Sequence, residues 1–361
     1  MKPICILVDS FADSCLPNAQ MSNAREIVAR LDPDHFHVTM FALGQPDSRL
    51  VNRPNTRLVH LPQRRQTVKI LSEFLLGRHS LLFYMKASPA SRWYQSVRRK
   101  LRDRRITIGT IESRSDLRNE PTITPQSVQL WEQTVLRCDY LYSNSRPVQS
   151  SLKREYGLSS EVIPTGVDTQ FFSPDWERPL NSRIQVLFVG SLRPFKQPQF
   201  LLAAAAKFPG TDFQIAGDGP MAAELASKIA REDLRNVTLR GPLSPGELKH
   251  AYRQADIFLF PSAWEGSPKV ILEAAACGLP VIVRNSYAPE TVLHGITGYQ
   301  AASDHEIFSR LEALITSADL RRKLGHAGRS HSQNFDWDLI TKQWEQAFAE
   351  IVGGGTLRRA S

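Results

Sequence analysis

The sequence predicts an α/β protein made of two doubly wound, Rossmann-like domains that face each other across a cleft. Short apolar runs suited to buried parallel strands alternate with helical stretches along the whole chain. The rhythm restarts after residues 174–183, a segment with two prolines and several polar residues that is typical of a linker. A length of 361 residues also fits two domains better than one.

Each element of the first half is predicted from its own pattern. Short apolar runs favour buried strands, whereas mixed stretches with apolar residues three or four apart favour helices. The expected strands are residues 4–8, 37–42, 81–85, 106–111, 140–143 and 161–163, and the expected helices are residues 24–31, 127–137 and 147–156.

The second half repeats this order, beginning with a strand that ends at Gly190 and an alanine-rich helix. The expected strands are residues 185–189, 213–216, 237–240, 257–260 and 281–284, and the expected helices are residues 200–207, 221–231, 246–253 and 270–277. The predicted domains are therefore residues 1–170 and 180–335. A final helix over residues 336–352 is expected to pack back on the N-terminal domain, and residues 353–361 to form a flexible tail.

Composition excludes several classes of protein. Hydrophobic residues make up 42% and charged residues 22%, which argues against a disordered chain. No apolar run approaches the roughly 20 residues that span a bilayer, and the apolar stretch at the N-terminus is short for a signal peptide. The four cysteines form no CxxC pair and the nine histidines show no ligand spacing, so we expect a cytoplasmic protein without a metal site.

Positive charge is concentrated in the first half of the chain. Residues 1–168 hold 24 Lys and Arg against 16 Asp and Glu, with the densest cluster at residues 92–105. This asymmetry predicts an anionic partner: nucleic acid, an acidic membrane or a phosphorylated acceptor. Nucleic acid is disfavoured because only Trp93 and Tyr94 stand near the cluster to stack on bases.

The same segment has the spacing of an amphipathic helix. Trp93, Val97 and Leu101 are four residues apart, and the three positions between Val97 and Leu101 are all cationic. One interpretation is peripheral attachment to an anionic membrane surface. The alternative is that the apolar stripe packs on the N-terminal sheet while the arginines stay in solvent.

Loops that follow the strands of the second half combine cations, glycines and carboxylates. Ligands bind at the carboxyl ends of strands in open α/β sheets. Gly266 and Ser267 stand before the expected helix 270–277, whose free N–H groups and dipole favour phosphate. Arg193 and Lys196 could reach the same anion, and Glu273 could accept hydrogen bonds from a ribose. The loops thus suit a nucleotide-sugar.

The ordered combination of these segments resembles the family 4 (group 1) retaining glycosyltransferases of GT-B fold. The resemblance rests on residues 163–168 (IPTGVD), 188–196 (FVGSLRPFK), 215–220 (IAGDGP), 289–290 (PE) and 294–298 (HGITG), and above all on Glu265 and Glu273 with the run AAACGLPVI after them. It covers residues 140 to 350 well and the first 140 only loosely.

The resemblance implies a role for each matching residue. Lys196 would neutralise the donor diphosphate, Glu273 would hold the ribose, and Glu265 would lie against the donor sugar as a catalytic residue. Gly266 and Ser267 would give backbone N–H groups to the phosphates. The activity implied is sugar transfer from a nucleotide-diphosphate sugar to an acceptor hydroxyl with retention, without a metal or other cofactor, because cations and a helix end replace the ion.

Four further donor-side positions follow from the same segments. They are Ser191, Arg193, Gly217 and Gly219. Ser191 departs from the family pattern, which has an arginine there; Arg193 either replaces that arginine or points to solvent. Gln197 stands where the family usually has a glycine.

The N-terminal half departs further. Residues 9–24 contain no glycine where the family has a glycine-rich loop, and Asn18 and Gln20 stand there as acceptor-side candidates. Glu112 follows the strand 106–111 at a position where the family often has a histidine near the reaction centre. Glu112 would either act on the acceptor or pair with Arg114 or Arg118.

These residues predict a glycosyltransferase for a cell-surface glycan, a glycolipid or an exopolysaccharide. The acceptor would be a glycan or a lipid-linked molecule, with an anionic group as one option. The alternatives are a non-catalytic nucleotide-sugar-binding protein on the same scaffold, which Ser191 and the glycine-free first loop keep open, and an inverting GT-B transferase.

Overall fold

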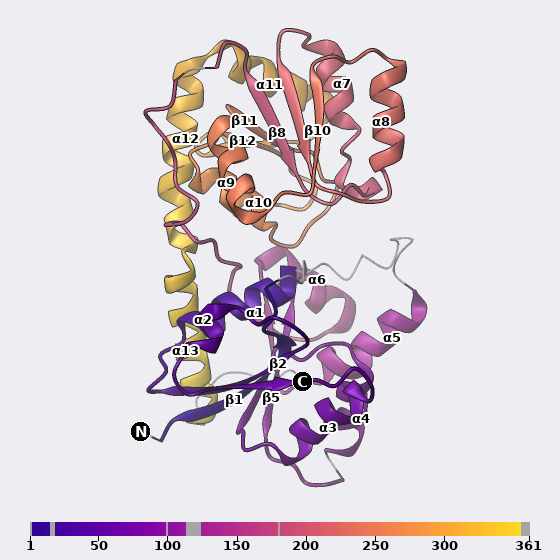
Figure 1. Ribbon diagram of the computed structural model, residues 1–361, viewed down its shortest axis with the longest axis vertical. Coiled ribbons are helices and arrows are strands. Elements are labelled where there is room, and N and C mark those ends of the chain that lie inside the picture. Colours follow the sequence, from indigo (N-terminus) through magenta and orange to yellow (C-terminus); the bar gives the residue numbers. More distant parts are fainter. Residues whose placement is uncertain (1, 15–18, 99, 113–123, 180, 355–361) are drawn as a thin grey trace. The chain divides into compact units, whose positions relative to one another are not determined.

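The computed structural model describes residues 2–14, 19–98, 100–112, 124–179 and 181–354. The chain forms two compact units: unit 1 combines residues 1–164 with residues 337–361, and unit 2 holds residues 165–336. Each unit contains one sheet of parallel strands (Figure 1). The α/β class and the two doubly wound sheets expected from the sequence are confirmed.

The sheet of unit 1 has seven strands in the order β3-β2-β1-β4-β5-β6-β7. This order reverses direction after β1, as in other doubly wound sheets. The strands are β1 (Ile4–Phe11), β2 (Phe36–Ala42), β3 (Thr56–His60), β4 (Leu81–Phe83), β5 (Ile106–Ile111), β6 (Tyr140–Ser143) and β7 (Glu161–Val162).

Several helices of unit 1 begin where a short polar residue is followed by proline. Ser88, Thr124 and Ser145 each accept a hydrogen bond from the backbone in the first turn, and each precedes a proline within the first two helical positions. The helices are α1 (Ala19–Arg30), α2 (Ser48–Val51), α3 (Gln66–Leu76), α4 (Pro89–Val97), α5 (Pro125–Thr134), α6 (Arg146–Tyr156) and α13 (Trp337–Val352), with a 3-10 turn at Val135–Arg137.

The sheet of unit 2 has six strands in the order β10-β9-β8-β11-β12-β13. They are β8 (Gln185–Val189), β9 (Asp212–Ala216), β10 (Val237–Gly241), β11 (Ile257–Phe260), β12 (Val281–Arg284) and β13 (Gly298–Ala301). The helices are α7 (Phe200–Lys207), α8 (Ala222–Arg231), α9 (Pro245–Gln254), α10 (Lys269–Ala276), α11 (Asp304–Thr316) and α12 (Ala318–Ser332), with 3-10 turns at Pro194–Lys196 and Gln333–Phe335.

The last helix, α13, completes the core of unit 1. Trp344 and Phe348 are buried, and their rings lie 4.8 and 4.9 Å from that of Phe83. The Phe348 ring also contacts Phe36 on β2 at 6.1 Å. Because burying one large apolar side chain contributes roughly 1.5–3 kcal/mol, these aromatic residues tie α13 firmly to the sheet.

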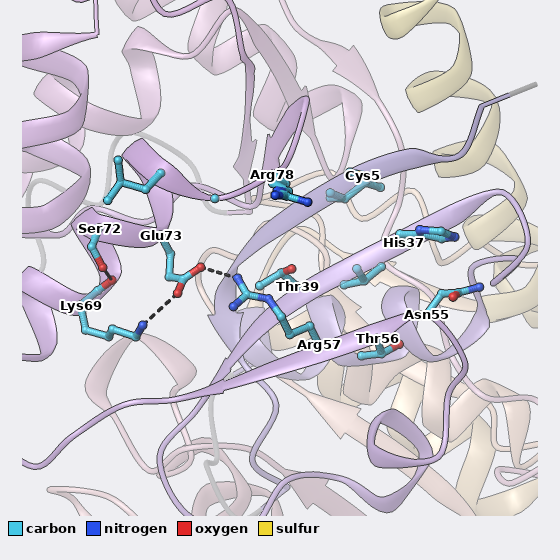
Figure 2. Close-up of a pocket in the computed structure, with 14 residues that line it drawn as sticks. Cys5, His37, Thr39, Asn55, Thr56, Arg57, Lys69, Ser72, Glu73 and Arg78 are labelled. Carbon is cyan, nitrogen blue, oxygen red and sulfur yellow. Dashed lines mark hydrogen bonds and ion pairs between the residues drawn. The ribbon is translucent and has the colours of Figure 1, made fainter.

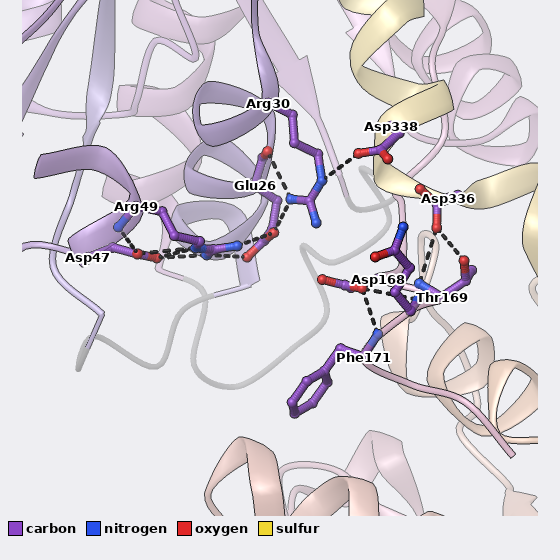
Figure 3. A network of polar contacts seen from close by, with 10 residues as sticks. Glu26, Arg30, Asp47, Arg49, Asp168, Thr169, Phe171, Asp336 and Asp338 are labelled. Atoms are coloured by element: carbon purple, nitrogen blue, oxygen red, sulfur yellow. Dashed lines mark hydrogen bonds and ion pairs between the residues drawn. The ribbon is translucent and has the colours of Figure 1, made fainter. Parts of the chain in front are cut away.

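Polar contacts fix the first turn of α13 to α1 (Figure 3). The Arg30 guanidinium donates to Asp338 at 3.0 Å and also to the Glu26 carboxylate. Burial opposes ionisation of Glu26, but hydrogen bonds and charge from Arg49 and Arg30 outweigh it and lower the Glu26 pKa. The start of α13 is therefore held by charge as well as by its aromatic face.

A separate contact joins the first and last segments of unit 2. Thr169 donates its backbone N–H at 3.2 Å and its hydroxyl to the Asp336 carboxylate, and Val167 pairs with Asp336 in a short parallel bridge (Figure 3). The segment expected to act as a linker is also tied to unit 2, because Arg178 and Asn181 donate to Asp256 at 2.5 and 2.9 Å.

The prediction of one continuous amphipathic helix through Trp93, Val97 and Leu101 is wrong. Helix α4 ends at Val97, with Arg98 as its C-cap, so Leu101 lies outside the helix. Trp93 is 57% and Leu101 61% exposed, so the alternative that this stripe packs on the sheet is also wrong for both residues. The spacing of four residues could not reveal where the backbone leaves the helix.

Two cations of this basic segment belong to the interior of unit 1. The Arg98 guanidinium donates to the Thr107 hydroxyl, to the Arg105 carbonyl and to the Asp139 carboxylate at 2.7, 2.7 and 2.8 Å. Arg105 donates to Asp103 at 2.8 Å and to two backbone carbonyls at the end of α3. The expectation that arginines here stay in solvent fails for Arg98 and Arg105.

Candidate functional site

Three loops of unit 2 that carry predicted site residues lie at one edge of its sheet. They follow β8, β9 and β11, which are neighbours in the order β9-β8-β11. Because all three strands are parallel, their carboxyl ends meet at the same edge. The fold therefore brings together residues that are up to about 80 positions apart in the chain.

Lys196 and Glu265 form an ion pair across two of these loops. The Lys196 ammonium donates to Glu265 Oε1 at 2.5 Å, and both side chains are largely buried, with 15% and 12% exposed. The same oxygen accepts a hydrogen bond from the Ser262 hydroxyl at 2.6 Å. The two predicted residues, one cationic and one anionic, thus neutralise each other.

Neighbouring groups hold this pair in position. Phe195 and Trp264 stack with ring centres 4.0 Å apart, and the Ala263 backbone N–H donates to the Phe195 carbonyl at 2.8 Å. The ammonium of Lys196 also lies 5.0 Å from the ring of Phe260 at the end of β11. Packing of this kind fixes the rotamers of a site before a ligand arrives.

Two predicted donor-binding glycines are explained by packing between loops. Gly217 has φ +134°, and a Cβ atom there would stand 1.9 Å from the Gly190 carbonyl oxygen. A Cβ atom on Gly219 would stand 2.7 Å from the Leu192 carbonyl oxygen. Leu192 is itself buried and donates its N–H to the Asp218 carbonyl at 2.9 Å. These glycines let the loop after β9 support the loop after β8.

We expect Gly217→Ala to destabilise unit 2, because the new methyl group must displace a backbone carbonyl and the backbone is held at positive φ. Strained conformations of this kind cost about 1–3 kcal/mol each before any steric clash. Thermal unfolding of the variant should show a lower midpoint. Gly246→Ala is the matched control, since a Cβ atom there meets nothing within 4 Å. Equal midpoints for both variants would contradict this explanation.

Helix α10 begins directly after the third loop. Pro268 is its N-cap and Lys269 its first residue. Gly266 and Ser267 precede the cap and are partly exposed. The N–H groups at the start of α10 therefore lie at the same sheet edge as Lys196.

Glu273 is not a solvated surface residue. It lies on α10, and the buried Tyr252 hydroxyl of α9 donates to its carboxylate at 3.0 Å. Burial raises the pKa of Glu273, while Lys269 and the Tyr252 hydrogen bond act in the opposite direction. Tyr252 orients this carboxylate, and nothing in the sequence pattern singles it out.

The two departures from the family pattern have different surroundings. Ser191 and Arg193 are partly exposed on the loop after β8, and the buried Leu192 between them anchors that loop. Gln197 adopts the left-handed conformation, with φ +51°, which glycine reaches at no cost. The Gln197 side chain accepts a hydrogen bond from Arg284 at 2.8 Å.

Unit 1 has a polar cluster of its own at the carboxyl end of its sheet. Glu112 follows β5, and its carboxylate accepts hydrogen bonds from the Tyr84 hydroxyl and, at 3.2 Å, from the Asn23 amide. Gln20 is exposed near the start of α1. Asn18, Arg114 and Arg118 lie outside the described residues.

Sequence reasoning missed three side chains near these clusters. Tyr84 follows β4 with φ +63°. Lys86 has a buried ammonium that makes no hydrogen bond to any described residue and lies 4.4 Å from the Phe11 ring. Burial lowers the Lys86 pKa. In unit 2, burial and the charge of Glu265 raise the pKa of Tyr287. The position of these residues just after strands was the only available signal.

The described residues hold no group of three or more His, Cys, Asp or Glu side chains that could bind a metal ion. Among the same residues, the structure contains no helix with the length and apolar character of a membrane span.

Comparison with known proteins gives a consistent picture for unit 2. Residues 172–331 match the family model described as "Glycosyl transferases group 1". D-inositol 3-phosphate glycosyltransferases of Mycobacterium tuberculosis and Mycobacterium bovis are 31% identical over 214 residues. This alignment covers 54% of the chain and 44% of each relative, so the chain matches less than half the length of these proteins.

Solved structures resemble the chain over nearly its whole length. Sucrose-phosphate synthase from Thermosynechococcus elongatus has a TM-score of 0.80 and 19% identity, covering 98% of this chain and all of the other. HepE of Anabaena, solved with UDP and glucose, has a TM-score of 0.76 and 17% identity, covering 96% and 99%. At these identities the likeness concerns the fold alone, and the predicted GT-B fold is confirmed.

Proposed function

Because this chain belongs to the glycosyl transferases group 1 family through residues 172–331, we propose that it is a retaining glycosyltransferase. It transfers a sugar from a nucleoside diphosphate sugar to an acceptor hydroxyl. The observation that carries the proposal is the Lys196–Glu265 ion pair beside the start of α10. The presence of UDP and UDP-glucose in HepE structures makes a UDP-sugar the first donor to test.

The ion pair provides a site prepared for the donor. A diphosphate carries more negative charge than one carboxylate, so it competes with Glu265 for the Lys196 ammonium. The start of α10 adds the positive end of the helix dipole. When Lys196 turns to the diphosphate, the Glu265 carboxylate is released next to the sugar.

Catalysis then depends on the leaving group. Lys196 and the start of α10 stabilise negative charge on the departing diphosphate, and this charge is greatest after the bond to the sugar begins to break. The acceptor hydroxyl approaches the same face of the sugar, which gives retention. Glu273, held by Tyr252, binds the ribose and fixes the nucleotide.

The acceptor belongs to unit 1 in this proposal. Glu112, with Tyr84 and Asn23 bonded to it, is the candidate for orienting or deprotonating the acceptor hydroxyl. A glycan or a lipid-linked acceptor for cell-surface or exopolysaccharide synthesis fits the family and the basic character of residues 1–168.

A donor screen tests the function directly. Thermal shift measured with UDP-, GDP- and ADP-sugars should identify one donor that raises the unfolding temperature, because a bound ligand stabilises the folded state by mass action. That donor should then release its nucleotide faster when acceptor is added. Donor binding without transfer or hydrolysis, over a broad acceptor set, would instead favour a non-catalytic sugar-nucleotide-binding protein.

Activity should persist in EDTA, since Lys196 and the start of α10 supply the positive charge that a metal supplies in other transferases. Initial rates with and without chelator are the measurement, and we expect a change of less than about twofold. Abolition by EDTA with specific recovery on adding manganese or magnesium would overturn the metal-independent mechanism.

Peripheral membrane attachment is a second property that we propose. Trp93 and Leu101 are exposed, and the exposed cations Arg92, Lys100 and Arg104 surround them in sequence. Each cation close to an anionic surface contributes roughly 1 kcal/mol. The protein should sediment with phosphatidylserine vesicles at low salt and not with phosphatidylcholine vesicles, and Lys100→Glu with Arg104→Glu should reduce binding. Equal behaviour with both vesicle types would refute this proposal.

A further inference from the structure

One face of the unit 1 sheet is only partly covered. On the face toward α1 and α13, apolar side chains continue along each strand, for example Ile6 on β1 and Val38 and Met40 on β2. On the face toward α3 and α4, the apolar residues Leu7, Phe41 and Val59 occupy the half nearest the carboxyl ends. Parallel sheets are normally covered by apolar packing on both faces.

The amino-terminal half of this second face carries polar side chains instead. Strand alternation places Cys5, His37, Thr39 and Arg57 on the same face as Leu7, Phe41 and Val59. Register confirms that they are neighbours, because Cys5 pairs with His37 and Thr39 pairs with Arg57. A polar row on an otherwise apolar face serves no packing purpose.

These residues form the floor of a pocket of about 740 Å³, and α3 forms one wall (Figure 2). From α3, Lys69 donates to the buried Glu73 carboxylate at 3.0 Å, and Arg57 donates to it from β3. Burial raises the Glu73 pKa, but the hydrogen bonds and charges of Arg57 and Lys69 lower it by more. The net effect lowers the pKa, so Glu73 is ionised.

Charge in the pocket is unbalanced. Arg57, Lys69 and Arg78 line it, with Glu73 as the one carboxylate among its described lining residues. The Glu73 oxygens are satisfied by the first two cations, which orients both toward the pocket. Within the described part of the chain, the side chains of Thr39 and Arg78 make no hydrogen bond, so they remain available to a ligand.

We propose that this pocket binds an anionic saccharide, a molecule that combines sugar hydroxyls with a phosphate or carboxylate group. The cations would hold the anion, and Thr39 and His37 would hold hydroxyl groups. A volume of about 740 Å³ falls within the range of roughly 300–1,000 Å³ that is typical of small-molecule sites. The site also accounts for part of the positive charge that the donor chemistry of unit 2 leaves unexplained.

This site is separate from the residues assigned to sugar transfer. Its strand residues lie in the amino-terminal halves of β1 and β2 and near the start of β3, whereas Glu112 follows the carboxyl end of β5. It therefore does not depend on the proposed function. The source of the saccharide is either a free sugar phosphate or an acidic segment of a glycan.

Binding to the full-length protein should be measured by titration calorimetry with glucose 6-phosphate and with tri-galacturonic acid. Glucose supplies the sugar hydroxyls without an anion, and inorganic phosphate supplies an anion without the sugar. We expect both to bind at least tenfold more weakly than the better anionic saccharide. Preference for glucose 6-phosphate would assign the site to sugar phosphates, and preference for tri-galacturonic acid to acidic glycans.

Two variants locate the binding site without removing a partner of Glu73. Arg78→Gln should weaken binding about tenfold or more, since hydrogen bonds to charged groups are the stronger kind, and Thr39→Val about threefold to tenfold. Arg64→Gln is the control, because Arg64 is an exposed arginine that does not line the pocket. Saturation with the ligand should also slow alkylation of Cys5 by iodoacetamide.

Two results would overturn the proposal: no binding of either anionic saccharide, or binding that Arg78→Gln and Thr39→Val leave unchanged. A competition experiment with UDP-sugar distinguishes the proposed saccharide site from the donor site. Added UDP-sugar should not displace the saccharide, and displacement would place the saccharide at the donor site instead. Failure to find any transferase activity would leave these binding results unaffected.

Discussion

Lys196→Ala is expected to lower the rate of sugar transfer by about 10²–10³-fold at saturating donor, the loss typical of removing one group that stabilises developing negative charge. The variant loses the ammonium that contacts Glu265 in the structure and would contact the diphosphate in the proposed complex. It also leaves the largely buried Glu265 carboxylate with its hydrogen bond from the Ser262 hydroxyl but without its cationic partner. Initial-rate kinetics with the donor found in the screen provide the measurement.

Glu273→Gln separates binding from catalysis. The amide keeps the shape of the side chain and can accept from the Tyr252 hydroxyl, but it binds ribose hydroxyls more weakly than a carboxylate. We expect a higher KM for the donor with a smaller change in kcat. Lys207→Ala, at the end of α7, is the control for a general loss of positive charge in unit 2. Near-normal turnover of Lys196→Ala and near-normal donor affinity of Glu273→Gln would together refute the site.

Arg98→Glu is expected to unfold unit 1 or to prevent its folding. The substitution removes three hydrogen bonds and places a new carboxylate against Asp139 in a largely buried position, where the Arg98 side chain is 10% exposed. Breaking a buried ion pair costs about 3–5 kcal/mol, a large part of the roughly 5–15 kcal/mol that stabilises a domain. Reversing the charge adds repulsion to this loss.

Urea unfolding followed by circular dichroism, with the yield of soluble protein, tests this prediction. Lys100→Glu is the matched control, because it reverses a charge two positions away on an exposed side chain and should change stability by no more than about 0.5 kcal/mol. If Arg98→Glu were as stable as Lys100→Glu, the buried contacts of Arg98 would be unimportant. Because Lys100→Glu should leave the fold intact, a change in its vesicle binding would report on membrane attachment and not on stability.

Local pattern was sufficient for the elements with strong apolar runs. Strands such as β8 and β11 were predicted within a residue or so, since each is a run of buried apolar residues. The edge strand β3 was missed, because it contains only two apolar residues, Leu58 and Val59. The helices α11 and α12 were also missed, although Ser303 and Ser317 cap both of them in the manner that sequence can reveal.

Contacts between distant residues could not be predicted. Lys196 and Glu265 were assigned to different parts of a donor. Nothing in the sequence indicates that these two side chains, 69 positions apart, are in direct contact. Arg98 was read as a surface cation because its neighbours in sequence are cationic, whereas its partners lie on β5 and just before β6. A cluster of charged residues in the sequence does not show which of them are buried, because burial depends on contacts made only in the folded protein.

The membership of α13 in unit 1 has a consequence for the order of folding during synthesis. Residues 165–336 form unit 2 as one continuous stretch, so the whole sequence of this unit is made before α13. Unit 1 lacks Trp337, Trp344 and Phe348 until α13 has been made. A ribosome-bound chain of 336 residues would therefore leave Phe36 and Phe83 without their aromatic partners. Although its first strands are synthesised before unit 2, unit 1 can complete its native core only after all residues of unit 2 have been made.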